Sequence, residues 1–163
     1  MTGQKYRLAL SIGALGAGVL YYALARQPEH VYFLPLWFPH PDFSLDWLSP
    51  LGDHLPTFIH VYAFILLTAL VASPSTARII PICSAWFILD SLLECAQLDP
   101  IARWIALHTP HWFYGIPFLE NTANYFLHGT FDVLDLLSIA AGTIAAYATI
   151  RITQGGPYNE YPS

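Results

Sequence analysis

The chain has 163 residues, of which 55% are hydrophobic and only 10% are charged, with a mean hydropathy of +0.47 and a formal net charge of -5. A typical soluble domain is about 25% charged, so this composition argues against a free soluble enzyme and against a disordered chain. Without a basic tail or stripe, nucleic acid is not an expected partner either. The length predicts a single domain over residues 1–163.

Four segments are long and apolar enough to cross a bilayer as helices, which takes about 20 residues each. We expect them at about 8–25, 55–72, 79–98 and 133–150. Lipid offers no hydrogen-bond partner to an unpaired backbone amide, and none of the four alternates with the period of a membrane strand. The sequence therefore predicts an all-α, polytopic membrane protein, a bundle of four transmembrane helices with the lipid bilayer as its immediate partner.

The first segment is rich in small residues, which let helices approach closely in lipid. We expect Gly13 and Ala17 here, together with Gly142 in the last segment, to be helix-packing positions. The same stretch also resembles a signal peptide that ends in the small-residue run 23–25. Two readings of residues 1–25 stay open: a retained span or a cleaved signal.

The segments that connect the spans on one side, 26–54 and 99–132, are rich in proline and aromatic residues. Aromatic rings with a polar edge suit the headgroup layer, so simple anchoring is the plain interpretation and a lid or docking surface is the functional one. Ile101, Trp104 and His108 fit one face of a short helix, which indicates an interfacial element.

Orientation follows from the six basic residues. Four of them, Lys5, Arg7, Arg78 and Arg151, flank the spans on one side, and the other two fall in the connecting loops on the opposite side. The excess of positive charge marks the cytoplasmic side. We therefore expect both termini in the cytoplasm and the two aromatic loops outside, in a bacterial inner membrane.

Cofactors and metals are not expected. Cys83 and Cys95 fall on one predicted helix, roughly 18 Å apart along its axis, so they cannot form a disulfide with each other. His108 and His111 are separated by a proline and have no cysteine partner nearby, which makes a weak metal signal.

Polar residues inside the predicted spans carry the functional argument, because a carboxylate there costs about 2.5–3.5 kcal/mol at a helix centre. Asp90, Glu94 and Gln97 share one face of the third segment at spacings of four and three. His60 in the second segment and Asp135 in the fourth fall at comparable depth from the outer side. A compact bundle would bring His60, Glu94, Gln97 and Asp135 into an outward-facing polar pocket, or use them as hydrogen-bonded fasteners between helices.

Catalysis is weakly signalled. The chain contains none of the patterns of a nucleophile elbow, a phosphate-binding loop, a zinc-binding helix or a dinucleotide fold. A histidine with two carboxylates is chemically able to act as a general base. We expect no catalytic residue, and a non-enzymatic protein is favoured.

Three short motifs resemble the VanZ-like family of small bacterial membrane proteins: a His and Tyr opening one span, Glu-x-x-Gln closing the next, and an Asp followed seven residues later by Gly in the last. The resemblance covers about residues 53–150. It implies an inner-membrane protein of the cell envelope whose polar positions are His60, Tyr62, Glu94, Gln97, Asp135 and Gly142.

These observations lead to one expected function and two alternatives. The first is an envelope protein whose outer-facing polar pocket binds a lipid-linked or amphiphilic ligand. The second is an accessory or structural subunit of a larger membrane complex, for which the glycine stripe and the aromatic loops would provide docking surfaces. The third is a membrane enzyme acting on an envelope lipid.

Overall fold

The computed structural model describes residues 3–25, 52–72, 75–116 and 119–154. Within these ranges every regular element is a helix, and no strand occurs. The elements are α1 (Gly3–Ala25), α3 (Leu55–Ala72), α4 (Thr76–Cys95), α5 (Asp99–His108), the short 3-10 helix η3 (His111–Phe113), α6 (Thr122–His128) and α7 (Val133–Gln154). The expected all-α architecture is confirmed for this part of the chain.

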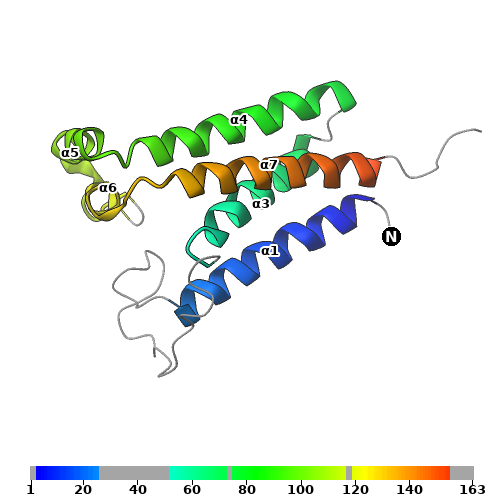
Figure 1. Cartoon of the computed structure of the whole chain (residues 1–163), viewed down its shortest axis with the longest axis horizontal. Coiled ribbons are helices and arrows are strands. Elements are labelled where there is room, and N and C mark those ends of the chain that lie inside the picture. The colour runs from blue at the N-terminus through cyan, green and yellow to red at the C-terminus, as the bar shows by residue number, and fades with distance from the viewer. Residues whose placement is uncertain (1–2, 26–51, 73–74, 117–118, 155–163) are drawn as a thin grey trace, which may run out of the picture.

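The four long helices form a bundle around α3, which contacts α1, α4 and α7. Figure 1 shows α1 and α4 running in one direction and α7 in the other, with α3 passing between them. The beginnings of α1 and α4 and the end of α7 therefore lie at one end of the bundle. The opposite end carries α5 and α6 (Figure 1).

The core lies where α3 packs against α7 and α4. Its buried members are aliphatic or small: Val61, Ile65, Leu66, Ala69, Ile79, Cys83, Ile139, Ala146 and Ile150. Both cysteines are free thiols. Gly142 lies where α7 approaches α3 closely, since a Cβ atom there would be 2.5 Å from Val61 Cγ1 and 2.7 Å from the carbonyl oxygen of Phe58. The missing side chain lets the backbones of α3 and α7 come together.

The outside of the bundle is apolar on every long helix. Fully or largely exposed aliphatic side chains include Ile12 on α1, Val71 on α3, Ile88 on α4 and Ile144 on α7. Among the described residues, α1, α3 and α7 are each long and apolar enough to cross a membrane. A fourth crossing is counted when α4 and α5 are taken together as one bent segment. A surface of this kind is what a bundle immersed in lipid presents.

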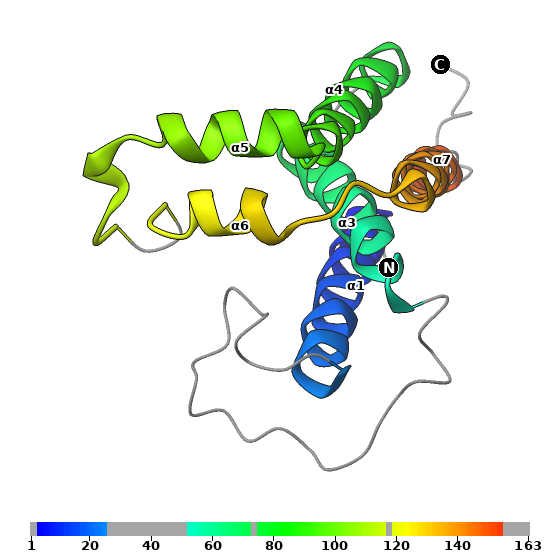
Figure 2. The same cartoon turned by 60° about the vertical axis from the view of Figure 1, so that its left-hand side comes forward.

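The chain turns sharply after α4. The axes of α4 and α5 differ by 92° across the short break 96–98. Figure 2 shows α5 and α6 side by side, projecting away from the bundle. We call residues 99–128, with these two helices and η3, the arm. The arm replaces most of the predicted loop 99–132, whereas nearly all of the loop 26–54 lies outside the described residues.

Two differences from the sequence predictions concern residues that were named as site or packing positions. The third predicted span ends at Cys95 rather than at residue 98, so Gln97 lies in the turn after the helix. Gly13 and Ala17 are exposed, and a Cβ atom at Gly13 would meet nothing within 4 Å. Within the described part of this chain they therefore pack against no other helix, because a different face of α1 points inward, with Ser11 fully buried and Gly18 against Ile59.

Candidate functional site

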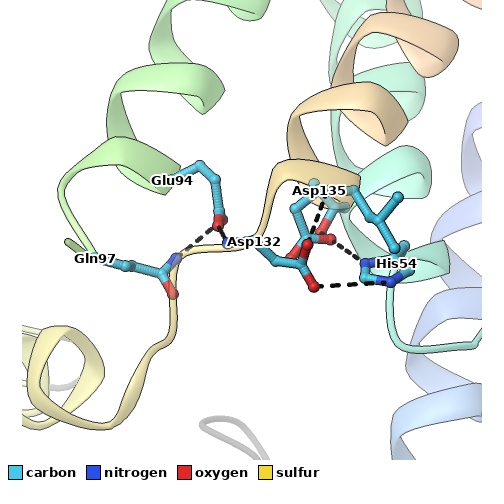
Figure 3. Close-up of polar contacts among 7 residues, drawn as sticks. His54, Glu94, Gln97, Asp132 and Asp135 are labelled. Atoms are coloured by element: carbon cyan, nitrogen blue, oxygen red, sulfur yellow. Dashed lines mark hydrogen bonds and ion pairs between the residues drawn. The ribbon is translucent and has the colours of Figure 1, made fainter.

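A cluster of polar side chains lies at the end of the bundle where the arm begins. We call it the polar cluster; its members are His54, Glu94, Gln97, Asp132 and Asp135, shown in Figure 3. They come from the residues before α3, the end of α4, the turn after it, and the start of α7. Three carboxylates and one imidazole thus meet where three helices begin or end.

Glu94 is the buried member of the cluster, with only 6% of its surface exposed. Its Oε1 atom accepts a hydrogen bond of 2.7 Å from the backbone N–H of Asp132, and its Oε2 atom accepts one of 3.2 Å from Gln97 Nε2. Each oxygen of the carboxylate therefore has a donor. This arrangement ties the end of α4 to the start of α7, which satisfies a carboxylate that burial would otherwise penalise.

Asp132 joins the two halves of the cluster. Its Oδ1 atom accepts a 2.8 Å hydrogen bond from the N–H of Leu134, which makes Asp132 the N-terminal cap of α7. Its Oδ2 atom lies 4.0 Å from His54 Nε2. The same residue therefore caps a helix, donates its own N–H to Glu94 and places a carboxylate beside the imidazole.

Asp135 and His54 form the other half (Figure 3). Asp135 Oδ1 lies 3.0 Å from His54 Nδ1 and accepts a 3.0 Å hydrogen bond from the hydroxyl of Thr57. Both side chains are largely buried, each 17% exposed. The imidazole lies between two aspartates, one near each nitrogen, and an imidazolium there would carry a hydrogen toward both.

A groove adjoins the cluster between α5, α6 and the segment 129–131. Its volume is about 580 Å³, and its lining includes the apolar Ala102, Phe126 and Phe131 and the polar Gln97, Asp99 and Arg103. Gln97 belongs to both features, since its Nε2 atom donates to Glu94 and also, at 3.3 Å, to the hydroxyl of Tyr125 on α6. The groove therefore joins apolar walls to the polar cluster through one amide.

Gly129 leaves space for the Gln97 side chain at the point where the groove meets the polar cluster. A Cβ atom at that position would overlap Oε1 of Gln97 and lie 3.0 Å from the carbonyl oxygen of Tyr125. Only glycine leaves the room that the amide occupies. The backbone of the α6–α7 connection thus forms one wall of the cluster.

The predicted polar pocket has four residues, and the family resemblance adds Tyr62 to them. Of these the structure brings together Glu94, Gln97 and Asp135. It does not bring His60 or Tyr62 to them. His60 Nδ1 lies 3.3 Å from Asp90 Oδ2, and the hydroxyl of Tyr62 lies 3.3 Å from Thr149 Oγ1 on α7. The prediction placed His60 too near the end of α3; His54 precedes it by six residues, which is about 9 Å along a helix, and takes the expected position.

Sequence reasoning missed His54, Thr57 and Asp132. Two signals were available for them. Asp132 directly precedes an apolar helical segment, which is the typical place of an N-cap residue. His54 and Thr57 precede or open the second segment on the side from which Asp135 opens the fourth, so their depth matches.

The cluster does not form a metal site. Among the described residues no three His, Cys, Asp or Glu side chains stand in a geometry that could hold a metal ion. The chemistry present is that of hydrogen bonding: carboxylates and an imidazole that bind each other, beside an open groove.

No family model matches the chain, and neither a curated protein nor a solved structure matches it.

Proposed function

We propose that this chain is an integral membrane protein of the bacterial cell envelope that binds a lipid-linked or amphiphilic ligand at the polar cluster and the adjoining groove. In this proposal α1, α3, α4 and α7 cross the inner membrane, the arm lies on its outer surface, and both termini are cytoplasmic.

The direction of the arm supports this placement. Where α4 crosses the bilayer along its normal, α5, which is bent from it by 92°, runs parallel to the plane of the bilayer. Trp104, Trp112 and Tyr114 are all at least 60% exposed on the arm, and such rings suit the headgroup layer. The polar cluster then lies directly beneath that layer.

The distribution of positive charge supports the orientation. Lys5 and Arg78 belong to the first turns of α1 and α4, and Arg151 belongs to the last turn of α7. All three lie at the end of the bundle opposite the arm (Figure 1). Basic residues collect on the cytoplasmic side of membrane proteins, which puts the arm outside.

The observation that carries the ligand proposal is the dual position of Gln97. This amide holds Glu94 and at the same time lines the groove of about 580 Å³. An amphiphile has an apolar part that fits walls such as Phe126 and Phe131 and a polar part that fits the amide and the charged rim. The three short motifs that resemble VanZ-like proteins fit an envelope location, and membership of that family is part of the proposal.

The test is lipid retention by the full chain purified in a mild nonionic detergent. Mass spectrometry of the wild-type protein should detect a discrete co-purified amphiphile. Glu94→Gln removes the charged acceptor that holds the Gln97 amide in place at the groove. We expect ligand retention to fall by about tenfold, which corresponds to the free energy of one hydrogen bond to a charged group. The matched control is Glu120→Gln, which changes an exposed carboxylate on the arm outside the cluster. Equal retention by all three proteins, each with the helical content of the wild type, would reject a role of the cluster in binding.

A second candidate function is that of an accessory subunit in a larger membrane complex. The observation that favours it is the outward face of α1, where Gly13 and Gly16 are exposed with open space around their Cα atoms. Small residues at a lipid-facing surface let a second helix approach closely. Gentle solubilisation distinguishes this candidate, because a lone particle of 18.2 kDa on native mass analysis counts against it.

A further inference from the structure

A second group of polar side chains lies deeper in the bundle and takes no part in the polar cluster. It consists of His60 on α3 and Asp90 on α4. Asp90 precedes Glu94 by four residues, or about 6 Å along the helix, so the pair lies one turn further from the arm. Its function is independent of the ligand proposed for the groove.

The pair is asymmetric in exposure. Asp90 is 6% exposed, whereas the His60 side chain is 48% exposed. His60 Nδ1 lies 3.3 Å from Asp90 Oδ2; an ionised carboxylate can only accept, so Nδ1 carries the hydrogen whenever Asp90 is ionised. The other ring nitrogen, Nε2, is then an acceptor on a half-exposed ring, held in that tautomer by the buried acid.

Asp90 has an acceptor left over. Its Oδ1 atom is buried and has no hydrogen-bond partner among the residues that the structure describes, and the same holds for the neighbouring hydroxyl of Ser91. A buried acceptor without a donor costs about 1–3 kcal/mol. Within the described residues, only one of the two carboxylate oxygens of Asp90 therefore has a hydrogen-bond partner, and that partner is His60.

Two aromatic rings lie near His60, Phe64 from α3 and Trp86 from α4. The ring of Phe64 lies 4.5 Å from that of His60, and the ring of Trp86 lies 6.3 Å from it. Phe64 and Trp86 are 5.0 Å apart, while the Trp86 N–H is already used by Thr68. Aromatic faces beside a carboxylate attract an organic cation, both through the ring quadrupoles and through the charge.

We propose that the His60–Asp90 pair, with Phe64 and Trp86, binds the protonated amine of a lipophilic molecule that enters sideways from the membrane. The ammonium group donates a hydrogen bond to His60 Nε2 and neutralises the Asp90 carboxylate. Its alkyl chain stays among the apolar side chains of α3 and α4. An anion is repelled by Asp90, and a metal ion lacks a third ligand among the described residues.

The probe is dodecylamine, added to the full-length protein in a nonionic maltoside detergent while the thermal unfolding midpoint is measured. A ligand that binds only the folded state raises this midpoint in a saturable manner. We expect such a rise with dodecylamine, a smaller one with dodecyltrimethylammonium, which has no N–H to donate, and none with dodecanol. A rise of equal size with dodecanol would overturn the proposal, since it would report general amphiphile binding.

Two variants locate the effect. Asp90→Asn should raise the apparent Kd for dodecylamine by about tenfold or more, the loss expected for one charge-assisted interaction. Glu120→Gln removes an exposed carboxylate on the arm that belongs neither to the pair nor to the groove, and it should leave the Kd unchanged. If Asp90→Asn fails to fold, His60→Gln serves instead, because that half-exposed ring can be replaced without opening the core. Unchanged affinity in the folded variant would reject the proposal, whether or not the groove near Gln97 binds its own ligand.

Discussion

At the scale of single residues, two kinds of position determine how the helices pack: the polar side chains inside apolar segments and the glycines at helix contacts. Glu94 and Asp135 are polar groups in apolar segments. A carboxylate costs free energy in lipid, and for that reason the sequence singles out both residues. Their partners were harder to predict. Helical periodicity gives the face on which His60 lies, but the rotation and depth of α3 against α4 and α7 decide whether that face meets Glu94 or Asp90.

Alanine substitutions at the two glycines named as packing positions should have opposite effects on the free energy of unfolding. Gly142→Ala places a methyl group against Val61 and the backbone of Phe58, and we expect it to lower the free energy of unfolding by about 1–3 kcal/mol. Gly13→Ala enters open space and gains helix propensity, so it should be neutral or stabilising by up to about 1 kcal/mol. Reversible unfolding in mixed detergent measures both. A neutral Gly142→Ala would mean that α3 and α7 are not in close contact at this position.

At the scale of elements, the sequence predicted helices well and their ends less well. The second span agrees with α3 in both bounds, because a predominantly apolar segment without a charged side chain begins at Leu55 and ends at Ala72. The third differs because Ala96 and Gln97 leave the regular helix and the chain bends before Asp99. Nothing in the hydropathy of residues 79–98 marks that bend, but Pro100 does, because a proline suits the first turn of a new helix and does not continue the preceding one.

The two sides of α5 should differ in how deeply they lie in the membrane. On α5, Ile101, Trp104 and His108 share one side, while Asp99 and Arg103 share the other and form an ion pair of 2.9 Å. If the arm lies flat on the membrane, a nitroxide attached at Trp104→Cys should lie about 5–10 Å below the lipid phosphates, where interfacial helices bury their apolar side. The same label at Arg103→Cys should remain accessible to a water-soluble relaxation agent.

These labels require a background in which Cys83 and Cys95 are replaced by alanine, and electron paramagnetic resonance in phosphatidylcholine vesicles gives the depth. Equal accessibility of both positions to the aqueous agent would show that the arm stands away from the bilayer.

At the scale of the whole molecule, the alternation of four long helices puts the start of α1 and the end of α7 at one end and the arm at the other (Figure 1). We expect Lys5→Cys and Arg151→Cys, in the same cysteine-free background, to be protected from a membrane-impermeant maleimide in intact bacterial spheroplasts. Trp112→Cys on the arm should be labelled there. Labelling of all three only after the membrane is permeabilised would contradict the proposed orientation.

The contacts of the polar cluster also have a consequence for how the protein is made. His54 and Asp135 are separated by 81 positions, and Glu94 finds the N–H of Asp132 only across 38 positions. Until residues 132–135 are synthesised, the earlier helices hold an imidazole that lacks both aspartates and a glutamate with a donor, Gln97, on only one of its oxygens. Both aspartates arrive together at the start of α7, so a nascent chain that stalls before residue 132 leaves the imidazole without an aspartate and one oxygen of Glu94 without its donor.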